Sequence, residues 1–196
     1  MADFIVSYTV TNKREGGYVN DSVDLGKETY RGISRKSWPK WSGWIIIDRY
    51  KNSYNFPDIL YSDQLLDIKV KQFYKNNFWD INSLDNFSSQ KIADEMFDTG
   101  VNMGTRTVAK HLQVALNILN NGGERYSDIS EDGAVGPNTI KALNSCLEHE
   151  DGEENIYKII NILQGFHYIF RMRESPSQEK FARGWLKRVE FLKTFD

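Results

Sequence analysis

The stretch "KREGGYVNDSVDLGKETYRGIS", residues 13–34, interrupts a chain that otherwise shows mainly helical patterns. It is rich in glycines and acidic residues and has almost no helical or strand period, which is typical of an irregular loop or a small hairpin. The paired glycines at 16 and 17 favour the end of a preceding helix, because glycine suits C-caps and turns better than helix interiors. The stretch therefore predicts a turn in the fold directly after a first helix.

Helical patterns lie on both sides of this stretch. The segments expected to be helical are residues 3–14, 62–79, 88–101, 104–120, 138–149, 156–173 and part of 175–192. No alternation of strands and helices suggests a parallel sheet. The sequence therefore predicts a mainly α fold with a short irregular or β-hairpin segment after the first helix.

Several apolar side chains have the spacing of a buried helix face. In the 62–79 segment, which begins at a Ser or Asp cap, the buried candidates include Leu65, Ile68, Phe73 and Trp79. In the 104–120 segment they are Val108, Leu112, Ala115, Leu116 and Leu119. The tryptophans at 38, 41 and 44 are three residues apart, and we expect at least two of them in the core, with a sugar-stacking platform as the alternative.

Composition excludes several classes of protein. The chain has 196 residues and a formal net charge of -2, which argues against a large basic surface for nucleic acid. Cys146 is the single cysteine, so neither an intramolecular disulfide nor a multi-thiolate zinc site can form. The three histidines, His111, His149 and His167, lack metal-ligand spacing. We expect no metal and no cofactor.

Targeting signals are also missing from the sequence. The start "MADFIVSYTVTNKR" does not have the pattern of a secretory signal, so we expect synthesis in the cytoplasm. The longest apolar runs, such as "FHYIF", are far shorter than the roughly 20 residues of a membrane span. We therefore expect no stable membrane insertion.

Glu15 is the first candidate for chemistry. It follows the predicted first helix, and packing against apolar neighbours would raise its pKa and keep it protonated near neutral pH. A protonated carboxyl donates to the leaving oxygen in glycoside hydrolysis. The alternative, slightly favoured by the residues alone, is a solvated acid at a helix end. Asp21, Asp24 and Glu28 offer a second carboxylate, and Thr29 offers a hydroxyl to position water; the aspartates also suit turns.

The blocks "EGGYVND" and "DLGKETYRGIS" resemble the start of the glycoside hydrolase family 108 lysozymes, muramidases of phages and bacteria that are often described as secretion activator proteins. The matching positions are Glu15, Gly16, Gly17, Tyr18, Asn20, Asp21, Asp24, Gly26, Thr29, Gly32, Ile33 and Ser34. The chain departs from the pattern at Ser22, Lys27, Tyr30 and Arg31.

Three later blocks extend the resemblance over nearly the whole chain. "MFDTGVNMGTRTVAKHLQVALN" is similar to a second family block, "DGAVGPNTIKAL" resembles part of the accompanying peptidoglycan-binding region, and "FARGWLKRV" resembles its closing stretch. The matching positions in the second and closing blocks are Phe97, Asp98, Asn102, Gly104, Gln113, Gly184, Trp185, Arg188 and Val189.

The resemblance implies a lysozyme-like helical fold with a catalytic region at 1–95 and a peptidoglycan-binding helical region at 96–196, packed as one compact unit. It implies hydrolysis of the β-1,4 bond between N-acetylmuramic acid and N-acetylglucosamine, with Glu15 as general acid, assisted by Asp24 and Thr29. The substrate contacts expected from it are Tyr18, Asn20, Tyr30, Asp98, Asn102 and Gln113. For Asp98 and Asn102, four residues apart on one helix, lining a cleft and stitching helices together are equally weighted alternatives.

The resemblance implies the glycan strand of peptidoglycan as the partner. It also implies a monomer of prophage or endolysin type, which acts in the periplasm or cell wall after its release. Two alternatives stay open. A non-catalytic cell-wall-binding or secretion-accessory protein would keep the fold, and a lytic transglycosylase would leave an anhydro sugar.

Overall fold

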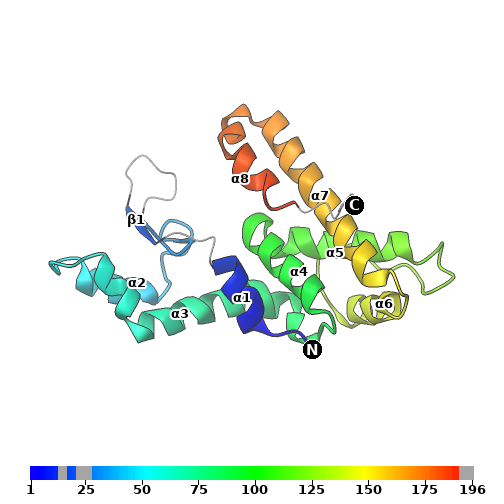
Figure 1. Cartoon of the computed structure of the whole chain (residues 1–196), viewed down its shortest axis with the longest axis horizontal. Helices are drawn as coiled ribbons and strands as arrows, with labels where there is room; N and C mark the ends of the chain where they lie inside the picture. Colours follow the sequence, from blue (N-terminus) through cyan, green and yellow to red (C-terminus); the bar gives the residue numbers. More distant parts are fainter. Residues whose placement is uncertain (13–16, 21–27, 190–196) are drawn as a thin grey trace, which may run out of the picture. The chain divides into compact units, whose positions relative to one another are not determined.

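A computed structural model describes residues 1–12, 17–20 and 28–189 of the chain (Figure 1). The longer helices are α1 (Phe4–Asn12), α2 (Gly43–Tyr50), α3 (Gln64–Tyr74), α4 (Gln90–Met103), α5 (Thr105–Leu119), α6 (Pro137–Leu147) and α7 (Gly152–Glu174). A three-stranded antiparallel sheet is formed by β1 (Tyr18–Asn20), β2 (Glu28–Tyr30) and β3 (Ile33–Ser34). The predicted mainly α fold with a small β segment after the first helix is confirmed.

Shorter helical turns complete the described chain. They are η1 (Asp58–Ser62), η2 (Lys75–Trp79), η3 (Asp80–Asn82), η4 (Leu84–Asn86), η5 (Pro176–Phe181) and the short helix α8 (Ala182–Leu186). The chain divides into two compact units, an N-terminal unit of Ile5–Asn77 and a C-terminal unit of Met1–Phe4 with Phe78–Asp196. None of the described helices is both long enough and apolar enough to cross a membrane.

Helix α3 in the N-terminal unit begins where the sequence indicates and buries Phe73 as predicted, but the rest of its buried face differs from the prediction. The carboxylate of Asp63 caps it by accepting a hydrogen bond from the Leu66 amide at 2.7 Å. Leu66 and Val70 are fully buried, whereas Leu65 and Ile68 are 55% and 49% exposed. The predicted burial of Leu65 and Ile68 is therefore wrong, because apolar residues occupy adjacent stripes of this helix and tertiary packing selects between them.

The three tryptophans do not share a helix, since α2 begins only at Gly43. Trp44 is 2% exposed and donates its indole N–H to the Trp38 carbonyl at 2.8 Å. Trp41 is half-buried and meets the Trp44 ring edge-on at 5.1 Å, and Trp38 is exposed. Only Trp44 lies in the core, so the expectation of at least two core tryptophans is wrong, because a three-residue spacing across turns does not define one buried face.

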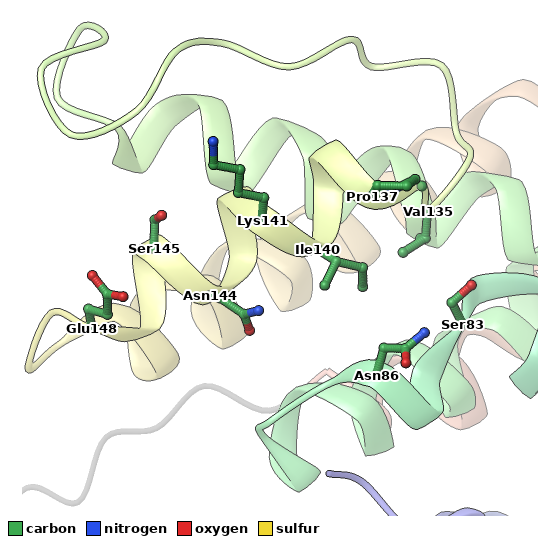
Figure 2. A pocket seen from close by; sticks show the side chains of 10 residues that line it. Ser83, Asn86, Val135, Pro137, Ile140, Lys141, Asn144, Ser145 and Glu148 are labelled. Carbon is green, nitrogen blue, oxygen red and sulfur yellow. The ribbon is translucent and has the colours of Figure 1, made fainter.

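The C-terminal unit is built on α4, α5 and α7, which pack against one another (Figure 1). Val108, Leu112, Ala115 and Leu116 of α5 are fully buried as predicted, and Leu119 is half-buried. Trp79 is fully buried, as predicted, and its ring meets those of Phe4 and Phe97 at 5.7 and 5.9 Å. This unit also contains a pocket of about 620 Å³ along α6 (Figure 2).

His111 on α5 makes the stability of the C-terminal unit depend on pH. Burial, and to a smaller extent repulsion from His167, lowers its pKa to about 4, so the folded chain holds it neutral near pH 7. Below pH 6.5 the unfolded chain binds a proton at this position that the folded chain does not bind. The free energy of unfolding therefore decreases as the pH falls from about 6.5 to about 4.

Chemical denaturation at a series of pH values tests this expectation. His111→Gln should remove part of the decrease between pH 6.5 and pH 4, on the order of 1 kcal/mol. His149→Gln, a histidine outside α5 and α7, is the matched control. Equal pH profiles for wild type and His111→Gln would contradict the assignment.

Candidate functional site

The small sheet fixes the position of Thr29. In the antiparallel register, Thr29 of β2 lies opposite Val19 of β1 and Ser34 of β3. Side chains alternate along a strand, and Glu28 and Tyr30 are buried while Thr29 is half-buried. Thr29 therefore faces away from the buried side of β2, where its hydroxyl is available to a ligand.

The predicted catalytic carboxyls Glu15 and Asp24 lie outside the described residues, as do Asp21, Ser22 and Lys27. The described residue nearest to Glu15 on its C-terminal side is Gly17, whose carbonyl accepts a hydrogen bond from the Arg31 amide at 3.1 Å. A Cβ at Gly17 would lie 1.8 Å from the hydroxyl oxygen of Tyr61. Gly17 and the Tyr61 hydroxyl therefore lie close together.

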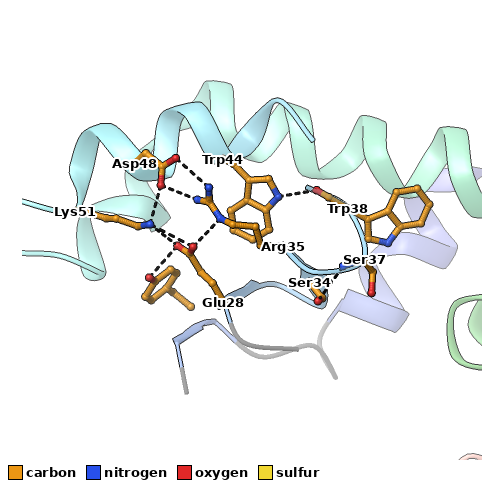
Figure 3. Close-up of polar contacts among 9 residues, drawn as sticks. Glu28, Ser34, Arg35, Ser37, Trp38, Trp44, Asp48 and Lys51 are labelled. Atoms are coloured by element: carbon orange, nitrogen blue, oxygen red, sulfur yellow. Dashed lines mark hydrogen bonds and ion pairs between the residues drawn. The ribbon is translucent and has the colours of Figure 1, made fainter. Parts of the chain in front are cut away.

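Glu28 starts β2 as a buried carboxylate with three partners (Figure 3). It is 7% exposed, and its oxygens lie 2.6 Å from the Arg35 Nε and 3.0 Å from the Lys51 Nζ. The Tyr18 hydroxyl donates to it at 3.0 Å. Both carboxylate oxygens are thus engaged, which makes Glu28 an anchor of the sheet rather than a free base.

Asp48 completes the charge cluster from α2 (Figure 3). The Arg35 guanidinium donates to both of its oxygens, at 2.6 and 3.1 Å, and Lys51 Nζ lies 2.8 Å away. The hydrogen bond from Arg35 lowers the pKa of Asp48 below its usual value. Arg35 also stacks over the Trp44 ring at 4.4 Å. Two carboxylates and two cations therefore hold the start of β2 to α2 with no net charge.

A second ion pair holds the other end of β2. Arg31, at a positive φ of 45°, donates to Asp67 of α3 at 2.8 Å, and its carbonyl accepts from the Tyr74 hydroxyl at 2.7 Å. Tyr30 is 1% exposed and its hydroxyl donates to the Leu60 carbonyl at 3.3 Å. Because its side chain is enclosed in the core, we leave Tyr30 out of the proposed substrate contacts.

Tyr18 and Asn20 belong to β1 and differ in their availability. Tyr18 is half-buried, meets the Phe56 ring edge-on at 4.7 Å, and supports Glu28 through its hydroxyl. Burial raises the pKa of Tyr18, and the hydrogen bond to Glu28 raises it further, so the phenol stays protonated. Asn20 is exposed, and its side chain makes a hydrogen bond with Tyr18.

The candidates in the C-terminal unit have structural partners. Asp98 pairs with Arg188 through both carboxylate oxygens at 3.0 Å, and the Asn102 amide donates to the Asp98 carbonyl at 2.7 Å. Of the two alternatives, the Asp98–Arg188 pair matches stitching, because it joins α4 to the segment after α8, whereas the Asn102 hydrogen bond lies within α4.

Gln113 is 1% exposed and organises the loop before α6. Its amide donates to Asp132 at 2.9 Å and to the Ala134 carbonyl at 3.0 Å, and its oxygen accepts from the Gly133 amide at 2.8 Å. The side chain is enclosed and engaged, so we leave Gln113 out of the proposed substrate contacts.

Sequence reasoning missed the partners of Glu28. Arg35, Asp48 and Lys51 are charged residues in ordinary polar surroundings, and only the spacing of Asp48 and Lys51 on a helical stretch hints at a pair. Across the part of the chain that the structure describes, no group of three or more His, Cys, Asp or Glu side chains is placed to hold a metal ion.

Two families match the chain in sequence. Residues 8–104 match the family described as "Glycosyl hydrolase 108", and residues 107–190 match the family described as "Predicted Peptidoglycan domain". These domains meet near residue 105, whereas the compact units divide at 77/78, and the boundary expected at 95/96 stays a prediction. No curated protein sequence matches the chain significantly.

A solved structure shares the fold. The protein of "Structure of Brucella abortus SagA" is similar with a TM-score of 0.62 and 18% identity, over 95% of this chain and 88% of that one. At this identity the likeness speaks for the fold alone.

We predict that Glu28→Gln destabilises the N-terminal unit by about 1–3 kcal/mol, because two cations lose a buried counter-charge. The measurement is urea denaturation followed by tryptophan fluorescence, since Trp44 packs on Arg35. The control is Glu154→Gln, which removes only a surface pair with Lys158 on α7 and should leave the stability close to that of the wild type. An equal cost for both variants would contradict the anchoring role of Glu28.

Proposed function

Because the chain belongs to the glycosyl hydrolase 108 family and continues into a peptidoglycan domain, we propose that it is a muramidase with Glu15 as general acid. The bond cleaved is the β-1,4 link between N-acetylmuramic acid and N-acetylglucosamine. The observation that carries the proposal is the family match over residues 8–104, which includes Glu15 and the sheet that bears Thr29.

In the proposed reaction the Glu15 carboxyl protonates the glycosidic oxygen as the bond to the sugar breaks. Thr29 lies on the central strand with its side chain away from the buried side, which suits a hydroxyl that orients the attacking water. Asp24 is the proposed carboxylate that activates this water or stabilises the cationic sugar. Asn20 and the half-buried Tyr18 are the proposed sugar contacts on β1.

The setting follows from the substrate. A glycoside hydrolase that carries a peptidoglycan domain acts at the cell wall. We assign the protein to the endolysin type, a monomer that reaches the wall from the cytoplasm after release, and the glycan strand is its partner.

We predict that Glu15→Gln lowers the rate of clearing of purified peptidoglycan by about 10²–10⁴-fold, because the amide cannot deliver the proton. The measurement is the loss of turbidity, with circular dichroism to verify folding. Glu154→Gln, an exposed acid on α7, should clear at the wild-type rate.

Equal clearing by wild type and Glu15→Gln would contradict the assignment of Glu15. Binding to peptidoglycan without clearing by the wild type would instead favour the non-catalytic wall-binding protein. Mass spectrometry of the fragments separates hydrolysis, which leaves a reducing sugar, from transglycosylation, which leaves an anhydro sugar.

For Thr29 we predict that Thr29→Val reduces clearing by about 10-fold or more, because it keeps the shape of the strand residue but loses the hydroxyl. Thr29→Ser keeps the hydroxyl and should retain most of the activity. The same turbidity assay compares the two variants. Similar losses in both would point to packing on β2 instead of water positioning.

A further inference from the structure

The pocket along α6 is lined on two sides by elements of the C-terminal unit (Figure 2). Ile140 and Asn144, one helical turn apart on α6, extend toward the side where Ser83 and Asn86 lie. The hydrolysis proposed above uses none of these residues. The pocket is therefore a separate place on the chain where a ligand can bind.

The walls of the pocket are fixed before any ligand arrives. Ser83 has a positive φ of 52° and is held in a tight turn, where its amide donates to Asp80 and its carbonyl accepts from Asn86. On the other side, the Gln113 amide fixes the loop that leads into α6. A preformed pocket loses little conformational freedom on binding, which favours affinity.

The lining has the chemistry of a peptide site. It combines a mainly apolar surface, to which Val135, Pro137 and Ile140 contribute, with hydroxyl and amide groups, one cation (Lys141) and one anion (Glu148). Among the described lining residues none is aromatic. A glycan strand presents flat apolar sugar faces that aromatic rings cover well, so this lining suits it poorly.

The length and polarity of α6 match a short peptide with charged ends. Lys141 and Glu148 are seven residues apart, which is roughly 10 Å along the helix at about 1.5 Å per residue, and three extended residues span about 10–11 Å. Lys141 lies in the middle of α6 and carries a positive charge, whereas Glu148 lies just after the C-terminal end of the helix and carries a negative charge. A ligand with a carboxylate at one end and an amine at the other is complementary to this arrangement.

We propose that the α6 pocket binds the peptide stem of peptidoglycan, with a stem carboxylate toward Lys141 and a stem amine toward Glu148. The stem is a short chain of amide groups and methyl side chains that carries free carboxylates and, on its dibasic residue, an amine. This inference rests on the proposed function only in taking peptidoglycan as the substrate. Binding of the stem holds the chain on the wall and raises the effective concentration of the glycan around it.

The test is a calorimetric titration of the full chain with a synthetic stem tetrapeptide that has a free amine and carboxylate on its third residue. Lys141→Gln and Glu148→Gln should each weaken binding about fivefold or more, because each removes one charge-assisted contact. The control is Lys158→Gln, an exposed lysine of α7 that pairs with Glu154 outside the pocket. All three positions lie on exposed helix surface, so the variants should fold.

No binding of the tetrapeptide, or equal binding by wild type, Lys141→Gln and Glu148→Gln, would overturn the proposal. Binding of an N-acetylglucosamine tetramer that Asn144→Ala weakens would also overturn it, in favour of a glycan site. The same preparations are assayed for clearing of peptidoglycan. Clearing without stem binding would remove the pocket assignment and leave the hydrolase, whereas stem binding without clearing would leave the pocket and remove the hydrolase.

Discussion

The ion pairs of Glu28 with Arg35 and Lys51 are the interactions on which the sheet beside the candidate site depends. A sheet of three strands, none longer than three residues, has too little area to be stable on its own. The cluster fastens the start of β2 to α2, and Arg31 fastens its end to α3 through Asp67. With both ends of β2 held, strand alternation decides the direction of the one residue between them, which is Thr29.

In the C-terminal unit, side-chain amides of α5 make hydrogen bonds to the backbone of the loop before α6. Asn117 exchanges two hydrogen bonds of 2.9 Å with the backbone of Ile129, and one turn earlier on α5 Gln113 engages Gly133 and Ala134. Gly133 has a positive φ of 77°, and a Cβ there would lie 2.8 Å from the Arg106 carbonyl oxygen. These contacts fix an otherwise irregular loop to α5 and thereby set where α6, and the pocket along it, begins.

Local signals in the sequence were sufficient to predict the helices but not to predict which tertiary contacts their residues make. The 3.6-residue period and the caps predicted α4, α5 and α6, and four of the five expected core residues of α5 are fully buried. For α3 two apolar stripes competed, and the choice depended on distant packing. The cluster around Glu28 joins residues up to 23 positions apart, so no local sequence pattern could predict it. A buried polar residue such as Gln113 has the sequence signature of a ligand contact, because its internal partners are visible only in the fold.

For this reason the residues of the motif that begins at Glu15 must be divided into those that make structural contacts and those proposed for chemistry. Gly17 and Tyr18 have structural neighbours, since Gly17 lies beside the Tyr61 hydroxyl and the Tyr18 hydroxyl donates to Glu28. Thr29 differs from them, because its neighbours on the strand make the anchoring contacts and its own side chain faces the other way. We therefore keep Thr29, on a strand that is held at both ends, as a proposed residue for the chemistry. The same anchors that leave Glu28 unsuited to act as a base thus provide the rigid support that a water-positioning hydroxyl requires.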